Sequence, residues 1–212
     1  HFIDDAAKAW QAKGIATYAF DQRGFGRTEG NGRWPGHDVM ASDARLFVSL
    51  VRARHPGVKV FLLGESMGGA VATLSASREG LEADGVILVS PAYWGWSNLD
   101  LLKRSALWTA MQLAPGGHLS GRGLNIRPSD NEKMLIALGE DPYVIKRTRV
   151  DATYGLVTLM DEAWKAAPQV TRPAWVLYAD DDEVVPSGPI VEAAHAMPGL
   201  KRLIGYKDGY HM

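Results

Sequence analysis

Segments with helical spacing of apolar positions alternate along the chain with short apolar runs. Apolar residues recur at every third or fourth position over residues 3–13 and 37–55, which predicts two amphipathic helices. Short apolar runs rich in β-branched and aromatic residues predict strands between and after them. The expected strands are residues 15–20, 58–63, 85–91, 174–179 and 201–206. This order is typical of an α/β protein, a mostly parallel sheet with right-handed crossovers and helices on both faces.

The alternation stops after the strand that ends near Pro91. Residues 92–170 show helical spacing and no strand pattern, and they hold four of the seven tryptophans. The helical stretches are 99–113, 130–138 behind a Ser129–Asp130 cap, and 154–167. We therefore expect residues 92–170 to form a helical insertion over the edge of the sheet. The core is then made of residues 1–91 and 171–212, with a further helix over 187–197.

The run Gly64-Glu-Ser-Met-Gly68 fits G-x-S-x-G and directly follows an expected strand. In this motif the serine sits on a strained turn from strand to helix, with its hydroxyl above the carboxyl edge of the sheet. Glycines at 64 and 68 lack the Cβ atoms that would clash where the two backbones approach each other. A helix starting at Met67 leaves the Met67 N–H free to donate to an oxyanion. The pentapeptide also arises by chance, but its context favours Ser66 as a nucleophile.

Two further groups follow later strands. An acidic turn, residues 180–183, comes after the strand at 174–179, and His211 comes after the last strand. Because the carboxyl ends of parallel strands share one edge, we expect these groups to lie near Ser66. Serine, acid, histidine is a known chain order for a catalytic triad. The histidine takes the serine proton, and the carboxylate fixes the tautomer of the imidazole.

The glycines of the loop at 21–30 do not have the spacing of a dinucleotide fingerprint. No helix follows them at once, so Asp21 and Arg23 are expected to brace a tight loop near the site. His37 and His55 lie at helix ends and are expected to be surface or capping residues. No phosphate loop and no H-E-x-x-H pattern occur, so we expect neither a metal nor another cofactor.

Composition narrows the remaining function classes. A net charge of −1 gives no general attraction to nucleic acid, so a nucleic-acid partner is not expected. The sequence has no apolar run of about 18 residues and therefore no expected transmembrane segment. The chain lacks cysteine, which excludes thiolate chemistry and a disulfide scaffold. It also favours a reducing, cytoplasmic location.

Several segments together resemble the monoacylglycerol lipase and lysophospholipase branch of the α/β-hydrolases, hydrolases of the serine aminopeptidase S33 type. They are the elbow at 64–69, the loop at 21–27, the insertion after Ser90-Pro91, the acidic turn at 179–186 and the terminal Asp208-Gly-Tyr-His211. The resemblance covers nearly the whole chain and implies an α/β-hydrolase fold. It places the triad acid at Asp182, because Ala179 stands where the family has the glycine of Gly-x-x-Asp. Asp181 is the second choice, and a solvated acidic cluster is the alternative.

The same resemblance implies parts that the 212 residues do not contain. Family members carry a His-Gly segment after an earlier strand, and it supplies the second oxyanion amide. His1 does not match that segment. We therefore expect a chain truncated at both the N-terminus and the C-terminus, with its second oxyanion donor outside it.

Together these features predict a serine hydrolase that cleaves carboxylic esters, with monoacylglycerols or lysophospholipid-like lipids as the expected substrates. By the resemblance, the insertion is a lid that supplies the acyl-binding surface and contacts a membrane or micelle. Its candidate substrate-binding residues are Trp94, Leu102, Trp108 and Met111, although such an apolar stripe is also typical of plain packing. Three alternatives stay open: an acyltransferase, a hydrolase of small esters or amides with the same triad, and a non-catalytic binding protein.

Overall fold

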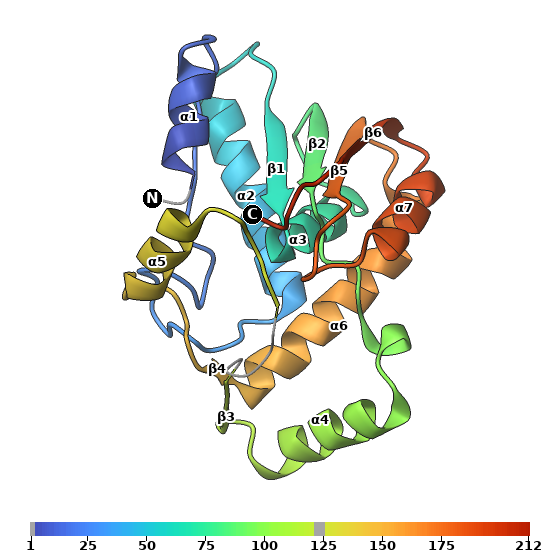
Figure 1. The fold of residues 1–212 in the computed structure, drawn as a ribbon. Coiled ribbons are helices and arrows are strands. Elements are labelled where there is room, and N and C mark those ends of the chain that lie inside the picture. Colours follow the sequence, from blue (N-terminus) through green and yellow to red (C-terminus); the bar gives the residue numbers. More distant parts are fainter. Residues whose placement is uncertain (1–2, 121–125) are drawn as a thin grey trace.

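A parallel sheet of four strands lies at the centre of the computed structural model, which describes residues 3–120 and 126–212 (Figure 1). The strands are β1 (Phe61–Glu65), β2 (Gly85–Val89), β5 (Ala174–Ala179) and β6 (Leu200–Tyr206). They lie in the order β1-β2-β5-β6 and pair in parallel throughout, so their carboxyl ends meet at one edge. Four of the five predicted strands are thus confirmed, with small changes in their bounds.

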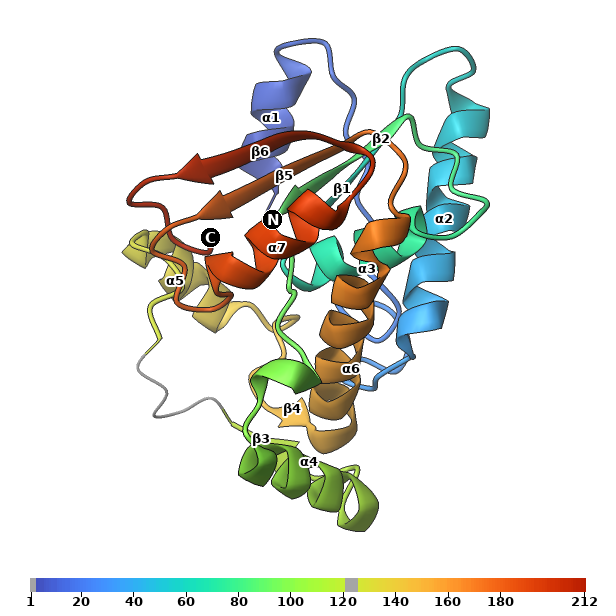
Figure 2. The ribbon, with the colours of Figure 1, turned by 90° about the vertical axis from the view of Figure 1, so that its right-hand side faces the viewer.

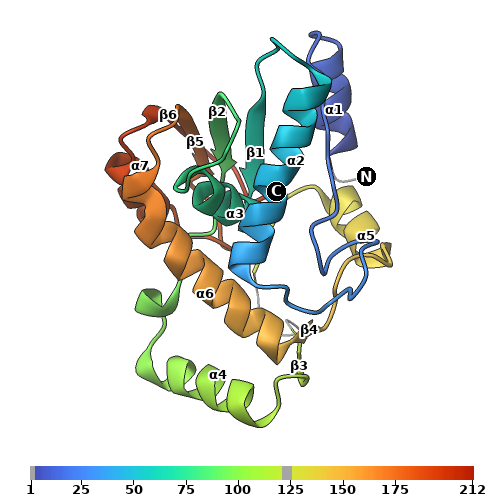
Figure 3. The same cartoon turned by 180° about the vertical axis from the view of Figure 1, so that it is seen from behind.

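Helices lie on both sides of the sheet, but α1 buries none of its residues, so only the opposite side is closely covered. In Figure 2, α1 lies on one side of it and α3, α6 and α7 lie on the other. The bounds of these helices and of α2 are α1 (Asp4–Gln11), α2 (His37–Arg54), α3 (Met67–Ala76), α6 (Val150–Ala166) and α7 (Ser187–Ala196). Seen from behind, α3 lies between α2 and α6 (Figure 3). Residues 69–76 of α3 are all buried, because their mostly small side chains permit close packing. No helix in the two described ranges is long and apolar enough to cross a membrane.

The strand predicted over residues 15–20 is wrong, because the structure has no regular element there. A strand needs a hydrogen-bonded neighbour, and none of the strands within the described ranges pairs with this stretch. Its side chains are exposed and contact α2 instead. The hydroxyl of Tyr18 lies 2.7 Å from Nε2 of His55, and the ring centroids of Phe20 and Phe47 are 4.4 Å apart.

β1 is an edge strand of the described sheet. It pairs with β2 on one side, through registers such as Leu63 with Ile87, and with no strand of the described ranges on the other. Two of its apolar side chains remain at the surface, with Phe61 52% and Leu63 41% exposed. The apolar run that predicts this strand is therefore not covered on both faces.

The long connection between β2 and β5, residues 92–170, is mainly helical, as predicted. Besides α6 it contains two 3-10 turns, η1 (Trp96–Asn98) and η2 (Ala167–Gln169), and two helices, α4 (Leu101–Leu113) and α5 (Glu132–Glu140). It also contains one short antiparallel pair, β3 (His118–Leu119) with β4 (Thr148–Arg149), which the sequence pattern missed because two residues carry no periodicity. The predicted Ser129–Asp130 cap of α5 is wrong by one residue. The Asn131 side chain caps the helix by accepting a hydrogen bond from the Met134 N–H at 3.1 Å.

The loop at 21–30 is braced as expected. The Asp21 carboxylate accepts a hydrogen bond from the Arg27 N–H at 3.0 Å, across the turn. Gly26 has φ +58°, and a Cβ there would lie 2.3 Å from Cγ of Asp21, so only glycine fits. Arg23 fastens the loop to α2 by donating from Nε and Nη2 to the two Asp43 oxygens, each at 3.0 Å.

Candidate active site

Ser66 lies at the turn between β1 and α3, in a backbone conformation that a serine rarely adopts. Its φ is 50° and its ψ is −119°. The surrounding backbone holds it there, since the Ser66 N–H donates to the Val89 carbonyl at 2.9 Å. The Ser66 carbonyl accepts hydrogen bonds from Gly69 at 2.9 Å and from Ala92 at 3.0 Å. Strained backbone of this kind is typical of functional sites.

The glycines of the elbow do not all have the predicted steric role. A Cβ on Gly64 would lie 2.2 Å from the Gly68 carbonyl oxygen, so the strand cannot carry a side chain there. A Cβ on Gly69 would lie 2.8 Å from Cα of Pro91. A Cβ on Gly68 would meet nothing closer than Nε2 of Gln22 at 3.8 Å. The prediction that Gly68 avoids a clash is therefore wrong, and Gly69 is the second glycine that packing requires.

The Asp182 carboxylate lies in the turn between β5 and α7, and both of its oxygens accept hydrogen bonds. Its side chain is 1% exposed. Oδ1 accepts hydrogen bonds from the Val184 and Val185 N–H groups, both at 2.8 Å. Burial raises the pKa of this carboxyl, but the hydrogen bonds from His211 and the two backbone N–H groups outweigh burial and hold the pKa below its ordinary value. Asp182 is thus kept ionised, while Asp180 and Asp181 are exposed.

His211 is buried against this carboxylate. The whole residue is 6% exposed, and its Nδ1 lies 2.7 Å from Oδ2 of Asp182. Since an ionised carboxylate only accepts hydrogen bonds, Nδ1 must carry a proton. In the neutral imidazole that leaves Nε2 unprotonated and able to act as a base. The structure places Asp182 in contact with His211, whereas the other candidate, Asp181, uses its backbone N–H to bind the Gly209 carbonyl at 3.1 Å.

Ser66 and His211 follow strands whose carboxyl ends lie at the same edge of the sheet. No hydrogen bond joins the two side chains within the described part of the chain. Burial raises the pKa of Glu65, the neighbour of Ser66, and the charge of a protonated His211 lowers it to a smaller extent. The turns and loop that carry the three candidate residues therefore follow the carboxyl ends of strands of one parallel sheet, and the acid and the histidine are in direct contact.

Glu65 is a site residue that the sequence reasoning missed. It is half-buried, and burial raises its pKa, although the charge of His211 partly opposes this rise. A polar residue inside G-x-S-x-G is not unusual, so the sequence carries no signal that His211 influences the Glu65 carboxyl electrostatically. Gln22 is a second such residue, because its side chain reaches Gly68 and its Oε1 is buried without a hydrogen-bond partner among the described residues.

The Met67 N–H is the first of helix α3, so no carbonyl within the helix accepts its hydrogen bond. The helix dipole adds partial positive charge at the same point. This amide can therefore donate to an oxygen that becomes negative next to Ser66. No group of three or more potential metal ligands occurs in the described ranges.

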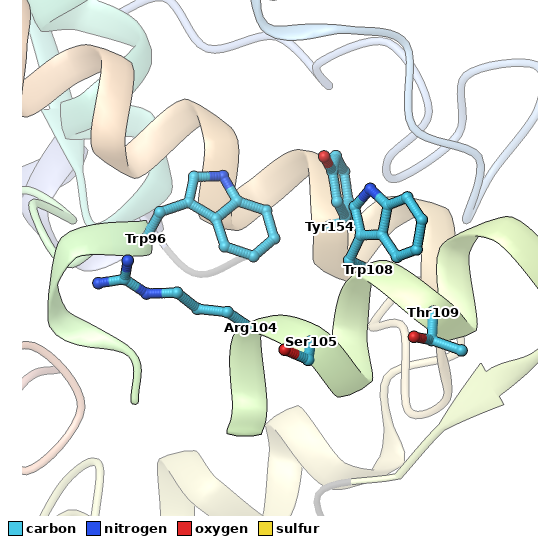
Figure 4. A pocket seen from close by; sticks show the side chains of 6 residues that line it. All are labelled: Trp96, Arg104, Ser105, Trp108, Thr109 and Tyr154. Atoms are coloured by element: carbon cyan, nitrogen blue, oxygen red, sulfur yellow. The ribbon is translucent and has the colours of Figure 1, made fainter. Parts of the chain in front are cut away.

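A cavity of about 650 Å³ lies between α4, α6 and η1 (Figure 4). It is lined by Trp96, Arg104, Ser105, Trp108, Thr109 and Tyr154. The ring centroids of Trp96 and Tyr154 lie 4.9 Å apart, and Nε1 of Trp96 donates a hydrogen bond to Oγ1 of Thr158 at 3.2 Å. Three of the six lining residues are thus aromatic, two carry hydroxyl groups and one is a cation. Neither Ser66 nor His211 lines this cavity.

Of the four residues predicted to bind substrate, Trp108 lines this cavity and is 56% exposed. Leu102 is 80% exposed and does not line this cavity. Trp94 is partly buried and packs against the core, and Met111 is half-buried in α4. The sequence pattern missed Trp96 and Tyr154, because they come from two separate elements that only the fold brings together.

The matching family, the sequence relatives and the similar solved structures agree with one another. The profile of the family described as "Serine aminopeptidase, S33" matches residues 1–212. The monoglyceride lipases of Rattus norvegicus and Homo sapiens are each 28% identical to the chain, over 99% of it and 70% of their own length. A crystal structure of the Paleococcus ferrophilus monoacylglycerol lipase superposes with a TM-score of 0.82 at 22% identity, over 100% of this chain and 80% of that one. For an α/β-hydrolase from Penicillium sp. sh18 the TM-score is 0.76 at 18% identity, over 98% and 76%. The α/β-hydrolase fold is therefore confirmed.

Proposed function

Because the chain belongs to the serine aminopeptidase S33 family and has the α/β-hydrolase fold, we propose that it is a serine hydrolase that cleaves carboxylic esters through an acyl-enzyme. The proposed triad is Ser66, His211 and Asp182. One observation carries it: a buried imidazole is hydrogen-bonded to an ionised carboxylate at the sheet edge that also carries the strained Ser66 elbow.

In the first half of the proposed reaction, Oγ of Ser66 forms a bond to the ester carbonyl carbon while Nε2 of His211 takes its proton. The carbonyl oxygen becomes an oxyanion and accepts a hydrogen bond from the Met67 N–H. The bond to the alcohol oxygen then breaks as His211 returns the proton to it. Hydrogen bonds between nucleophile and base often tighten only when substrate binds, so the missing Ser66 to His211 bond is compatible with this step.

In the second half, a water molecule attacks the acyl-enzyme. His211 takes one proton from the water, the new bond to oxygen forms, and Oγ of Ser66 leaves with the proton that His211 returns. Asp182 keeps Nδ1 protonated and stabilises the imidazolium that forms in each half. Its two hydrogen bonds from backbone N–H groups hold the carboxylate in place.

We propose monoacylglycerols or lysophospholipid-like esters as substrates, by similarity to the relatives named monoglyceride lipase. Residues 92–170 then form a cap over the core, residues 1–91 and 171–212. The cavity of this cap, with three aromatic residues including Trp108 in its wall, has the size and chemistry to take part of an acyl chain. The exposed leucines of α4, Leu101, Leu102 and Leu113, would meet a micelle or membrane.

Labelling with a fluorophosphonate probe, followed by a chain-length series of aryl esters and monoacylglycerols, tests the proposal. The probe should label Ser66, and Ser66→Ala should abolish labelling and lower kcat by on the order of 10⁶. Ser97→Ala, at an exposed serine of η1, serves as the control and should label like the original protein. A folded protein that does not label at Ser66 would indicate a binding protein instead. Transfer of the acyl group to added alcohol in preference to water would indicate an acyltransferase.

A further inference from the structure

A short segment of the long connection, residues 127–129, reaches back to the loops that carry two of the proposed catalytic residues. The Arg127 N–H donates a hydrogen bond to Oε2 of Glu183 at 2.7 Å. The Pro128 carbonyl accepts one from the Met212 N–H at 3.0 Å. Glu183 directly follows Asp182, and Met212 directly follows His211. The segment therefore bridges the acid loop and the histidine loop, each one residue from its catalytic group.

A third contact strengthens the bridge on the histidine side. The Arg127 guanidinium lies over the Tyr210 ring, 5.1 Å from its centroid, which is within the range of a cation–π interaction. Tyr210 is the residue before His211. The histidine is thus flanked by one neighbour held through its side chain and another held through its backbone, both by the same segment.

The far end of the segment is anchored as well. Ser129 is 1% exposed, and its Oγ accepts a hydrogen bond from the Asn131 N–H at 3.2 Å. Asn131 is the residue that caps helix α5. The segment is therefore fixed between the start of α5 and the two loops.

The histidine loop needs such support because it lies outside the regular elements. It follows β6 without forming a helix or strand, and Asp208 has a left-handed φ of 55°. Within the loop, the Gly209 carbonyl accepts a hydrogen bond from the Asp181 N–H at 3.1 Å. A catalytic imidazole must be held closely in position, since a displacement of about 1 Å can cost about 10²-fold in rate.

We propose that Arg127 and Glu183 are positioning residues for His211, which act through the loops on either side of the imidazole and not through the substrate. This inference rests on the proposed function. Arg127 holds Tyr210, and the Glu183 carboxylate holds the backbone of Arg127 against the acid loop. Together they keep Nδ1 of His211 on Oδ2 of Asp182 while residues 92–170 change their contacts with a substrate.

Two pairs of variants separate the contacts. Glu183→Ala removes the acceptor for the Arg127 N–H, whereas Glu183→Gln keeps an oxygen there. Arg127→Ala removes the guanidinium over Tyr210 and keeps the backbone hydrogen bond. Its matched control is Arg202→Ala, since Arg202 lies over the Trp175 ring at 5.0 Å on the sheet, away from the site. All variants are made in the protein as its gene encodes it, and circular dichroism checks that each one folds.

The first readout is the kinetics of a short-chain p-nitrophenyl ester. Glu183→Ala and Arg127→Ala should each lower kcat about tenfold and change KM less than about twofold, because the base is misplaced and the binding surface is intact. Glu183→Gln should keep at least about half of the original kcat, and Arg202→Ala should match the original protein. If Glu183→Ala and Arg127→Ala both keep the original kcat, or if KM alone changes, the inference is overturned.

The second readout does not require activity. The proton on Nδ1 of His211 should give a low-field NMR resonance, assigned by its loss in Asp182→Ala. It should broaden in Glu183→Ala and in Arg127→Ala, and stay sharp in Arg202→Ala. A protein that neither labels at Ser66 nor turns over esters, but shows this broadening, contradicts the proposed function and supports the structural coupling. A labelled, active protein with unchanged resonances in all variants contradicts the positioning role alone.

Discussion

Nδ1 of His211 lies 2.7 Å from Oδ2 of Asp182, although 29 residues separate the two in the chain. β5 and β6 bring them together, because these strands are parallel neighbours and both loops leave the sheet at the same edge. The contact is nearly dry, with the side chains 5% and 1% exposed. Water therefore competes little with this hydrogen bond, and a variant that loses the hydrogen bond should have a much lower kcat.

The first prediction concerns Asp182→Asn. An amide has a donor and an acceptor, so it no longer dictates which imidazole nitrogen carries the proton, and kcat should fall by about 10⁴. Asp181→Asn, at the neighbouring residue, should change kcat less than about twofold, because Asp181 is exposed. Steady-state kinetics on a soluble ester measure both. Equal losses in the two variants would show that the triad acid has been misassigned.

The second prediction concerns the two glycines of the elbow. Gly64→Ala should lower the free energy of unfolding by about 3 kcal/mol or more, because its Cβ would meet the Gly68 carbonyl oxygen at 2.2 Å. Gly68→Ala should change it by no more than about 1 kcal/mol, since that Cβ has room and alanine favours a helix. Urea unfolding of both variants checks this pair. Similar losses would mean that the elbow opens to accept a side chain at either position.

The third prediction is a pH dependence of stability through Glu65. Burial raises the pKa of Glu65 above its ordinary value of 4.5, so the folded state binds the proton more tightly than the unfolded state. Stability from this group is present below pH 4.5 and is lost as pH rises through the folded pKa. Glu65→Gln should therefore be more stable than the original protein at pH 7, with the difference shrinking towards pH 4.5.

The control for this experiment is Glu79→Gln, at an exposed glutamate after α3. It should leave the free energy of unfolding nearly unchanged at both pH values. Urea unfolding at pH 7 and pH 4.5 measures the two variants side by side. A Glu65→Gln protein that is less stable at pH 7 would show that attraction to His211 outweighs burial.

The fourth prediction concerns chain-length specificity. Trp108→Ala removes a large part of the aromatic cavity wall, so KM for a long-chain ester should rise about fivefold, with KM for an acetyl ester unchanged. Leu102→Ala, in the same helix but outside the cavity lining, should leave both values within about twofold when the esters are dissolved as monomers. A larger effect of Leu102→Ala would place the acyl chain on the outer face of α4.

The sequence was most informative where local pattern and tertiary environment agree. α2 is marked by its helical spacing, β2 and β5 by continuous apolar runs, and the elbow by its glycines, so these elements lie within a few residues of their predicted bounds. Residues 15–20 have an equally strong strand pattern. They are not a strand, because strand formation depends on a partner that the pattern itself does not specify.

For a similar reason, the sequence predicts only part of the candidate site. Ser66, Asp182 and His211 follow from chain order and the family resemblance, and the structure places the acid beside the histidine. The electrostatic influence of His211 on Glu65 and the contact of Arg127 with Tyr210 each join side chains that share no local sequence pattern. Only the assembled loops reveal them.

The open edge of β1 affects how the chain behaves in concentrated solution. Its backbone groups on that edge pair with no strand of the described ranges, and the apolar side chains of Phe61 and Leu63 stand beside them. Such an edge is a template for pairing with a second molecule, and no proline interrupts it. The 212 residues on their own should therefore self-associate as concentration rises, and a lysine in place of Leu63 should suppress the light scattering that reports it.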